Sequence, residues 1–193
     1  MSIAATILSK SPESRGQHTA ESYSVAITST PVIAAGAAAG ATPTVAISGD
    51  DLAGTITITT GTTALGANGI LATITFGNTF GAAPDVLITP ANQVANELTV
   101  DKRVVCLDAD TTTALFKLRA GTNAPADGTA YVFNYKVENA TVTLTITAKW
   151  LFSVEQVQVN FPNEGFSISG NVVTIKGVPC NTTGGQVTLL GKM

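Results

Sequence analysis

The clearest pattern in this chain is the alternation of apolar and polar residues in its first half. Between residues 55 and 59 isoleucines alternate with threonines, so the two residue types point to opposite faces of an extended segment. Similar runs return at residues 70–76 and 86–88, after segments rich in Gly, Asn and Pro. These three runs predict a β-meander inside an all-β domain.

Further alternating runs follow. The run at residues 130–138 places one set of large side chains on a single face: Tyr131, Phe133, Tyr135 and Val137. We also expect strands at residues 23–28, 103–108, 114–119, 141–149, 154–160, 166–169, 172–176 and 186–190. Gly170 and Asn171 predict a two-residue hairpin turn. No run of ten residues has helical periodicity, so the predicted fold is an all-β, antiparallel β-sandwich of meander or Greek-key type.

The punctuation between these runs divides the chain into four segments. Residues 1–30 form a polar N-terminal arm, which we expect to dock on a partner. Residues 31–46 are rich in Ala and Gly, and are either a linker or a tightly packed extended segment. The main β-sandwich domain spans residues 47–139. A second, smaller β-domain spans residues 140–193. Neither Ala nor Asp occurs in it after Ala148.

The composition indicates a surface that is partly covered. Charged residues make up only 12% of the chain, about half the usual share, whereas there are 30 Thr and 27 Ala. We interpret this as a protein covered by its own copies or by a larger assembly. The alternative is a monomer whose threonine hydroxyls keep it in solution. The net charge of −3 and the lack of a basic cluster exclude nucleic acid as an expected partner.

The main domain resembles a β-domain found in bacteriophage tail fibres and other virion-surface structural proteins. The resemblance covers about residues 47–137 and is carried by the runs at 48–61, 71–76, 83–84, 87–92 and 133–137. It implies a virion structural protein, a fibre or host-attachment module. The alternatives are a capsid decoration (cement) protein and, more distantly, a non-viral carbohydrate-binding or adhesin module. The shared runs contain no catalytic residues, so the resemblance implies no functional site.

This reading leads to expectations about partners and location. We expect copies of the chain itself, as a homotrimer, together with capsid, neck or tail proteins and a host-surface glycan. The apolar patch at residues 3–8 has no basic segment before it, so we expect synthesis in the host cytoplasm without a signal peptide, followed by a place on the virion surface. Gly and Pro interrupt the apolar stretch at residues 32–46, so no membrane insertion is expected.

Residue types that carry chemistry are few. The single histidine, His18, has no nucleophile or carboxylate at a useful spacing, and one His with two distant cysteines cannot close a zinc site locally. Cys106 and Cys180 are expected as reduced thiols, with one disulfide between them as the alternative. We therefore predict no enzyme and no cofactor.

Three weaker kinds of site remain. Four acidic residues in loops are weak calcium candidates, with turn formation and solvent exposure as the alternative: Asp50, Asp51, Asp108 and Asp110. Apolar residues of the arm are candidate docking anchors: Ile3, Ile7, Leu8 and Tyr23. Trp150 is a candidate glycan contact, although a lone Trp beside Leu and Phe is more often part of a core or an interface.

Overall fold

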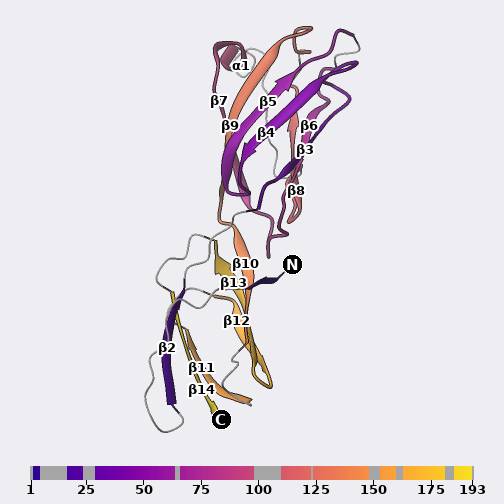
Figure 1. Cartoon of the computed structure of the whole chain (residues 1–193). Helices are drawn as coiled ribbons and strands as arrows, with labels where there is room; N and C mark the ends of the chain where they lie inside the picture. The colour runs from indigo at the N-terminus through magenta and orange to yellow at the C-terminus, as the bar shows by residue number, and fades with distance from the viewer. Residues whose placement is uncertain are drawn as a thin grey trace. The chain divides into compact units, whose positions relative to one another are not determined.

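A computed structural model describes residues 2–4, 17–23, 29–63, 66–97, 110–122, 124–147, 153–159, 163–180 and 185–192. The chain divides into two compact units. Unit 1 contains Met1–Ala26, Phe80–Ala82 and Thr141–Met193, and unit 2 contains Ile27–Thr79 and Ala83–Ala140. Strands dominate both units (Figure 1), which confirms the predicted all-β class. The helix in the described part of the chain, α1 (Gln93–Glu97), has five residues.

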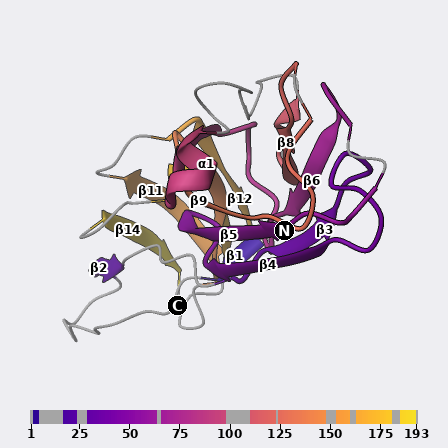
Figure 2. The same ribbon diagram turned by 90° about the horizontal axis from the view of Figure 1, so that it is seen from above.

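Unit 2 consists of two antiparallel sheets. The runs at residues 55–59, 70–76 and 86–88 do not form the predicted β-meander, because the second run belongs to one sheet and the other two to the other. The larger sheet has the order β4-β5-β9-β7, with β4 at Thr44–Gly49, β5 at Ala53–Thr59, β9 at Ala130–Glu138 and β7 at Asp85–Pro90. The smaller has the order β3-β6-β8, with β3 at Val32–Ala35, β6 at Ile70–Thr75 and β8 at Leu115–Arg119. Figures 1 and 2 show the two sheets as separate layers.

The core of unit 2 lies on the faces that the alternation predicts. The large side chains of β9 that share one face are all buried, and Phe133 lies opposite Ile56 of β5. Phe116 of β8 connects the two layers, because its ring centroid lies 5.7 Å from that of Tyr135 in the other sheet and 5.5 Å from that of Phe76. Tilted aromatic pairs at such distances add to the stabilisation that burial provides.

Residues 31–46 are packed into unit 2. They contain β3 and the first residues of β4, and Ala38 and Ala39 between these strands are buried. The N–H of Gly36 donates to the carbonyl of Leu71 at 2.8 Å, and that of Ala38 to the carbonyl of Ile70 at 2.9 Å. Of the two structures that the sequence left open for this segment, the structure has the tightly packed one, since small side chains allow the backbones to approach closely.

Unit 1 also has two sheets. One has the order β1-β10-β13-β12, with β1 at Ser2–Ala4, β10 at Thr141–Thr147, β13 at Val172–Pro179 and β12 at Gly165–Ser169. The other has the order β11-β14-β2, with β11 at Ser153–Val159, β14 at Gly185–Lys192 and β2 at Gln17–Tyr23. Among the described pairs only β1 with β10 is parallel.

The N-terminal segment differs from the expected separate arm. β1 pairs with β10 and β2 pairs with β14, so parts of residues 1–30 complete sheets built from the C-terminal strands. The structure has a strand at Gln17–Tyr23 that the sequence did not predict. Of the strand expected at residues 23–28 only Tyr23 is described, so that strand stays a prediction. The polar run that forms β2 has little intrinsic strand signal; pairing with β14, distant in sequence, stabilises it instead.

The C-terminal strands follow the predicted pattern closely. Ser169 pairs with Val172 across Gly170 and Asn171, and Gly170 has a φ of 60°, as a type II′ hairpin turn requires. The predicted two-residue turn is therefore confirmed. The strand expected at residues 103–108 lies outside the described residues, as do residues 148–149 and 160 at the ends of two others.

Candidate functional site

Asp50 forms the turn that the sequence offered as the alternative to calcium binding. Its Oδ1 accepts hydrogen bonds from the backbone N–H of Leu52 at 2.8 Å and of Ala53 at 3.0 Å. The N–H of Asp50 in turn donates to the carbonyl of Ala53 at 3.0 Å. This local arrangement leads the chain from β4 into β5.

Asp51 has a different role from Asp50, because it binds groups that are distant in the sequence. Its side chain is fully buried and accepts hydrogen bonds from the backbone N–H groups of Gly77 and Asn78, both at 2.8 Å. The hydroxyl of Ser29 also donates to Oδ2, and the amide of Asn78 lies 3.4 Å from the same atom. One carboxylate therefore joins three loops of unit 2 that are far apart in sequence.

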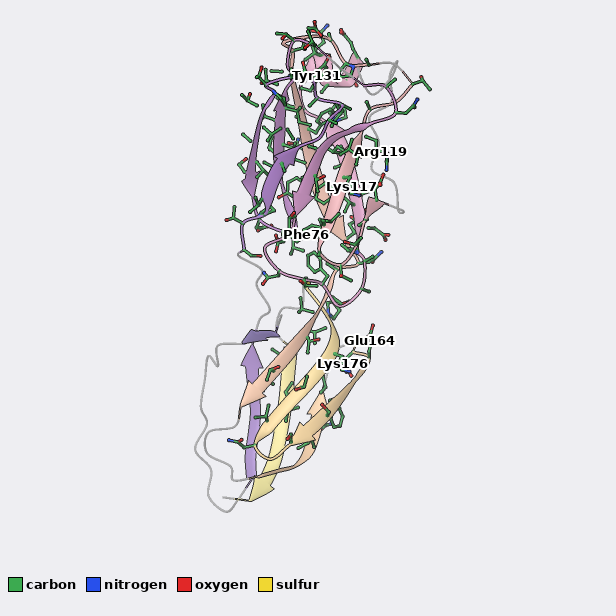
Figure 3. The ribbon with its side chains drawn as sticks, turned by 90° about the vertical axis from the view of Figure 1, so that its right-hand side faces the viewer. Phe76, Lys117, Arg119, Tyr131, Glu164 and Lys176 are labelled. Carbon is green, nitrogen blue, oxygen red and sulfur yellow. The ribbon has the colours of Figure 1, made fainter. Side chains whose placement is uncertain are left out.

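Asp110 is also held by an internal partner. Arg119 of β8 donates to it with two groups, Nε and Nη2, the second at 2.8 Å from Oδ1. The hydrogen bond from Arg119 holds the pKa of Asp110 below its ordinary value, and the charge of Lys117 acts in the same direction. Lys117 and Arg119 lie along the same strand (Figure 3).

These contacts bear on the calcium hypothesis. Asp50, Asp51 and Asp110 all make hydrogen bonds within the chain, and Asp108 lies outside the described residues. Within the described ranges, no group of three or more His, Cys, Asp or Glu side chains is arranged to hold a metal ion. The structure brings Asp50 and Asp51 into one turn of unit 2, but gives each carboxylate a different set of partners.

Tyr135 lies above the same turn. Its hydroxyl donates to the carbonyl of Asp50, and a Cβ at Gly54 would come within 2.7 Å of the Tyr135 ring and hydroxyl. Burial, followed by the charges of Asp50 and Asp51, raises the pKa of Tyr135 to about 12. The phenol is therefore neutral and serves as a hydrogen-bond donor that closes the core over Gly54.

This raised pKa predicts a loss of stability at high pH. The folded protein keeps the Tyr135 proton to a higher pH than the unfolded chain, so the stabilisation is full below about pH 10 and is lost as the pH rises toward 12. We expect Tyr135→Phe to lower the free energy of unfolding by about 1 kcal/mol at pH 7. The difference between native chain and variant should shrink between pH 10 and 12 in urea unfolding. A constant difference over that window would contradict the assignment.

The other sequence candidates are placed only in part. Ile3 lies in β1, opposite Leu144 of β10, and Tyr23 lies in β2, opposite Gly185 of β14. Ile7, Leu8 and Trp150 lie outside the described residues, as does Cys106. Cys180 is buried in unit 1. The docking role of the anchors, the glycan role of Trp150 and the state of the thiols therefore stay predictions.

Sequence reasoning missed a set of exposed apolar side chains. The largest exposed fractions belong to Val32 of β3 at 66%, Leu87 of β7 at 50% and Phe166 of β12 at 49%, and Ile168 of β12 follows at 38%. β3, β7 and β12 are all edge strands of their sheets. Each such edge presents main-chain groups that a further strand can bind.

β12 combines both properties, and we call it the β12 edge (Gly165–Ser169). Phe166 lies opposite Ile175 of β13, and Ile168 lies opposite Val173. Residues directly opposite share a face, and Ile175 and Val173 are fully buried, so Phe166 and Ile168 belong to the core face of this sheet. The apolar core face therefore continues outward onto a strand whose every residue is exposed.

The outer face of the larger sheet of unit 2 is different in character. Threonines of β5 pair mostly with small or polar residues: Thr55 with Ser48 and Asn134, and Thr57 with Ala46 on one side and Val132 on the other. The Thr55 hydroxyl donates to Asn134 Oδ1 at 3.0 Å. These hydroxyls share the face with Lys136 of β9, whose Nζ lies 2.7 Å from Oε1 of Glu138. Threonine hydroxyls thus supply part of the solvated surface of this sheet, which accounts for part of the low charge content.

Comparison with family models, with curated proteins and with solved structures found no match to this chain. In the described residues, no helix is both long and apolar enough to cross a membrane.

Proposed function

We propose that this chain is a structural protein of a bacteriophage virion, a fibre or host-attachment module that projects from the particle surface. The observation that carries this proposal is the β12 edge, where Phe166 and Ile168 of the core face are 49% and 38% exposed. Apolar surface of this kind at a free strand edge is typical of a chain that another chain covers. It supports action by attachment.

The arrangement of the acidic residues supports the same proposal. The carboxylates of Asp51 and Asp110, which are buried, serve backbone amides and an arginine of the same unit. Their chemistry is therefore used to hold loops in place. Together with the low charge content and the resemblance of residues 47–137 to phage β-domains, this favours a module whose role is its shape.

A capsid decoration protein is the second candidate. The resemblance spans both kinds of particle protein, and a module with exposed strand edges fits between capsomers as well as along a fibre. Deleting residues 1–30 does not test either role cleanly, because β1 and β2 complete the sheets of unit 1 and the deletion would expose both sheets.

The test is immunogold electron microscopy of purified particles from a lysate of cells that carry the gene, with an antibody raised against the full chain. A fibre or attachment module predicts gold at the tail or at one vertex. A decoration protein predicts gold distributed over the head. The control is the same antibody after adsorption to purified chain. Particles that carry no gold above this control would contradict both roles.

A further inference from the structure

We infer that the β12 edge is a contact between two copies of this chain, which pair antiparallel about a twofold axis at Ser167. The inference deepens the proposed function, because it takes this edge as one that is covered in the assembly, and it names the partner. The argument uses four features of β12: its apolar rows, its main-chain groups, its self-complementary sequence and its charge.

The apolar rows of the sheet stop at β12 without being covered. One row runs from Leu144 through Ile175 to Phe166, with exposed fractions of 0%, 0% and 49%. The next runs from Ile146 through Val173 to Ile168, with 7%, 0% and 38%. Burial is therefore nearly complete on two strands and fails on the third.

The main-chain groups of the same two residues point away from β13. In a two-residue hairpin the residues that flank the turn, here Ser169 and Val172, exchange hydrogen bonds, and such pairs alternate along the strands. The N–H and C=O groups of Ser167 and Gly165 therefore face β13. Those of Phe166 and Ile168 face outward, and among the described strands β12 has β13 as its single neighbour.

The sequence of β12 is complementary to itself in the antiparallel direction. With Ser167 on the axis, Phe166 lies opposite Ile168 of the second copy, and Ile168 lies opposite Phe166 of the second copy. Both residues have outward main-chain groups, so each pair exchanges two N–H to C=O hydrogen bonds. An axis perpendicular to the sheet keeps equal faces together. The apolar rows of one copy thus continue into those of the other.

Charge favours a second copy as the occupant. Gly165–Ser169 contains no charged residue and no proline, the usual means by which an edge strand prevents pairing. The nearest charge, Glu164, is held beside β13, where its N–H donates to the Lys176 carbonyl at 2.9 Å (Figure 3). In the paired form it lies opposite Gly170 of the second copy. The two Glu164 residues are then about 20 Å apart along the strands, where repulsion is screened.

Other edge strands are less suited to pairing with a second copy. β7 ends with Pro90 and begins with Asp85, both of which discourage pairing. β4 has no charge, but the residues on its outer face are small or polar: Thr44, Ala46 and Ser48. Among the edge strands whose side chains the structure describes, only β12 carries two exposed large apolar residues, and both lie on the core face and have outward main-chain groups.

The first experiment measures the mass of the full chain by sedimentation equilibrium over a wide concentration range. We expect a reversible dimer of the 19.6 kDa chain. Ser167→Lys places two ammonium groups at the axis and should raise the dissociation constant on the order of 100-fold. Thr89→Lys, the same change on exposed β7 of unit 2, should leave it unchanged. A monomer at all concentrations, a trimer, or a dimer that Ser167→Lys does not weaken would overturn the inference.

The second experiment tests the register. Ser167 forms a non-hydrogen-bonded pair with its copy, with Cα atoms about 4.5 Å apart, which a disulfide can span. Ser167→Cys should therefore give a covalent dimer in mild oxidant. Ser169→Cys should not, because its copies lie about 13 Å apart along the strands. The native chain controls for its own two cysteines. Equal crosslinking of both variants, or none with Ser167→Cys, would contradict this register.

These outcomes separate the inference from the proposed function. A chain that stays monomeric and still labels particles would overturn the twofold pairing and leave the virion role in place. A chain that dimerises through Ser167 and labels no particle would do the reverse. A mass of three chains would instead support the threefold arrangement that the sequence predicted.

Discussion

Asp51→Ala should lower the free energy of unfolding of unit 2 by about 3–5 kcal/mol, since it leaves several buried donors without an acceptor. The carboxylate is fully buried and accepts from the N–H groups of Gly77 and Asn78 and from the hydroxyl of Ser29. The alanine side chain cannot accept a hydrogen bond, and the donors stay buried where the Asp51 side chain is in the native chain. The loss therefore exceeds that of an ordinary surface hydrogen bond.

The measurement is urea unfolding followed by circular dichroism, with hydrogen exchange of the Asn78 amide as a local probe. Asp127→Ala is the matched control, because Asp127 is an exposed aspartate of the same unit and its removal should change the free energy by no more than about 0.5 kcal/mol. Asp51→Asn should fall between the two, because its amide keeps one acceptor but turns a donor toward the backbone amides. If Asp51→Ala matched Asp127→Ala, the proposed role of the carboxylate would be wrong.

The same comparison separates hydrogen bonding from metal binding. If Asp51 acts only through the donors of the described loops, a chelator leaves the unfolding of the native chain unchanged. If it holds calcium, the chelator lowers the stability of the native chain and not that of Asp51→Ala. The second result would restore the calcium hypothesis for Asp51.

The sequence predicted the strands whose burial is one-sided. In β9 the aromatic residues recur at every second position and all face the core, so period-2 alternation is visible without any knowledge of the partner strands. β13 was found for the same reason, whereas β12 was found by its alternation of apolar and polar residues although all of them are exposed. Their connecting turn was found because glycine tolerates the positive φ that Gly170 adopts. Local signals were sufficient for these strands, but β4 was not predicted although it pairs with its sequence neighbour β5.

Elements stabilised by distant partners were missed. β1 and β2 belong to sheets whose other strands come from the last third of the chain, and neither carries an alternation strong enough to identify it alone. The role of Asp51 was invisible for the same reason, since its donors Gly77 and Asn78 lie 26 and 27 residues away. The exposure of Phe166 was also missed, because alternation predicts a face and does not say whether a second layer covers it.

Gly61→Ala, at a residue against which the Ala/Gly-rich segment (residues 31–46) packs, should lower the free energy of unfolding of unit 2 by about 3 kcal/mol or more. A Cβ at Gly61 would lie 1.7 Å from the carbonyl oxygen of Ala41, so the backbone itself would have to move. Both backbone groups of Gly61 are held as well, its N–H by the carbonyl of Ala39 at 2.8 Å and its carbonyl by the N–H of Gly128 at 3.1 Å. No relaxation is available that keeps these bonds.

Gly66→Ala is the matched control for this prediction. A Cβ there would meet Ala38 at 3.4 Å, which is ordinary contact, so the change should be neutral within about 0.5 kcal/mol or slightly stabilising. Urea unfolding of both variants distinguishes the two structures that the sequence allowed for residues 31–46. A flexible tether would tolerate both alanines equally, whereas a segment packed backbone to backbone against Gly61 tolerates only the one at Gly66.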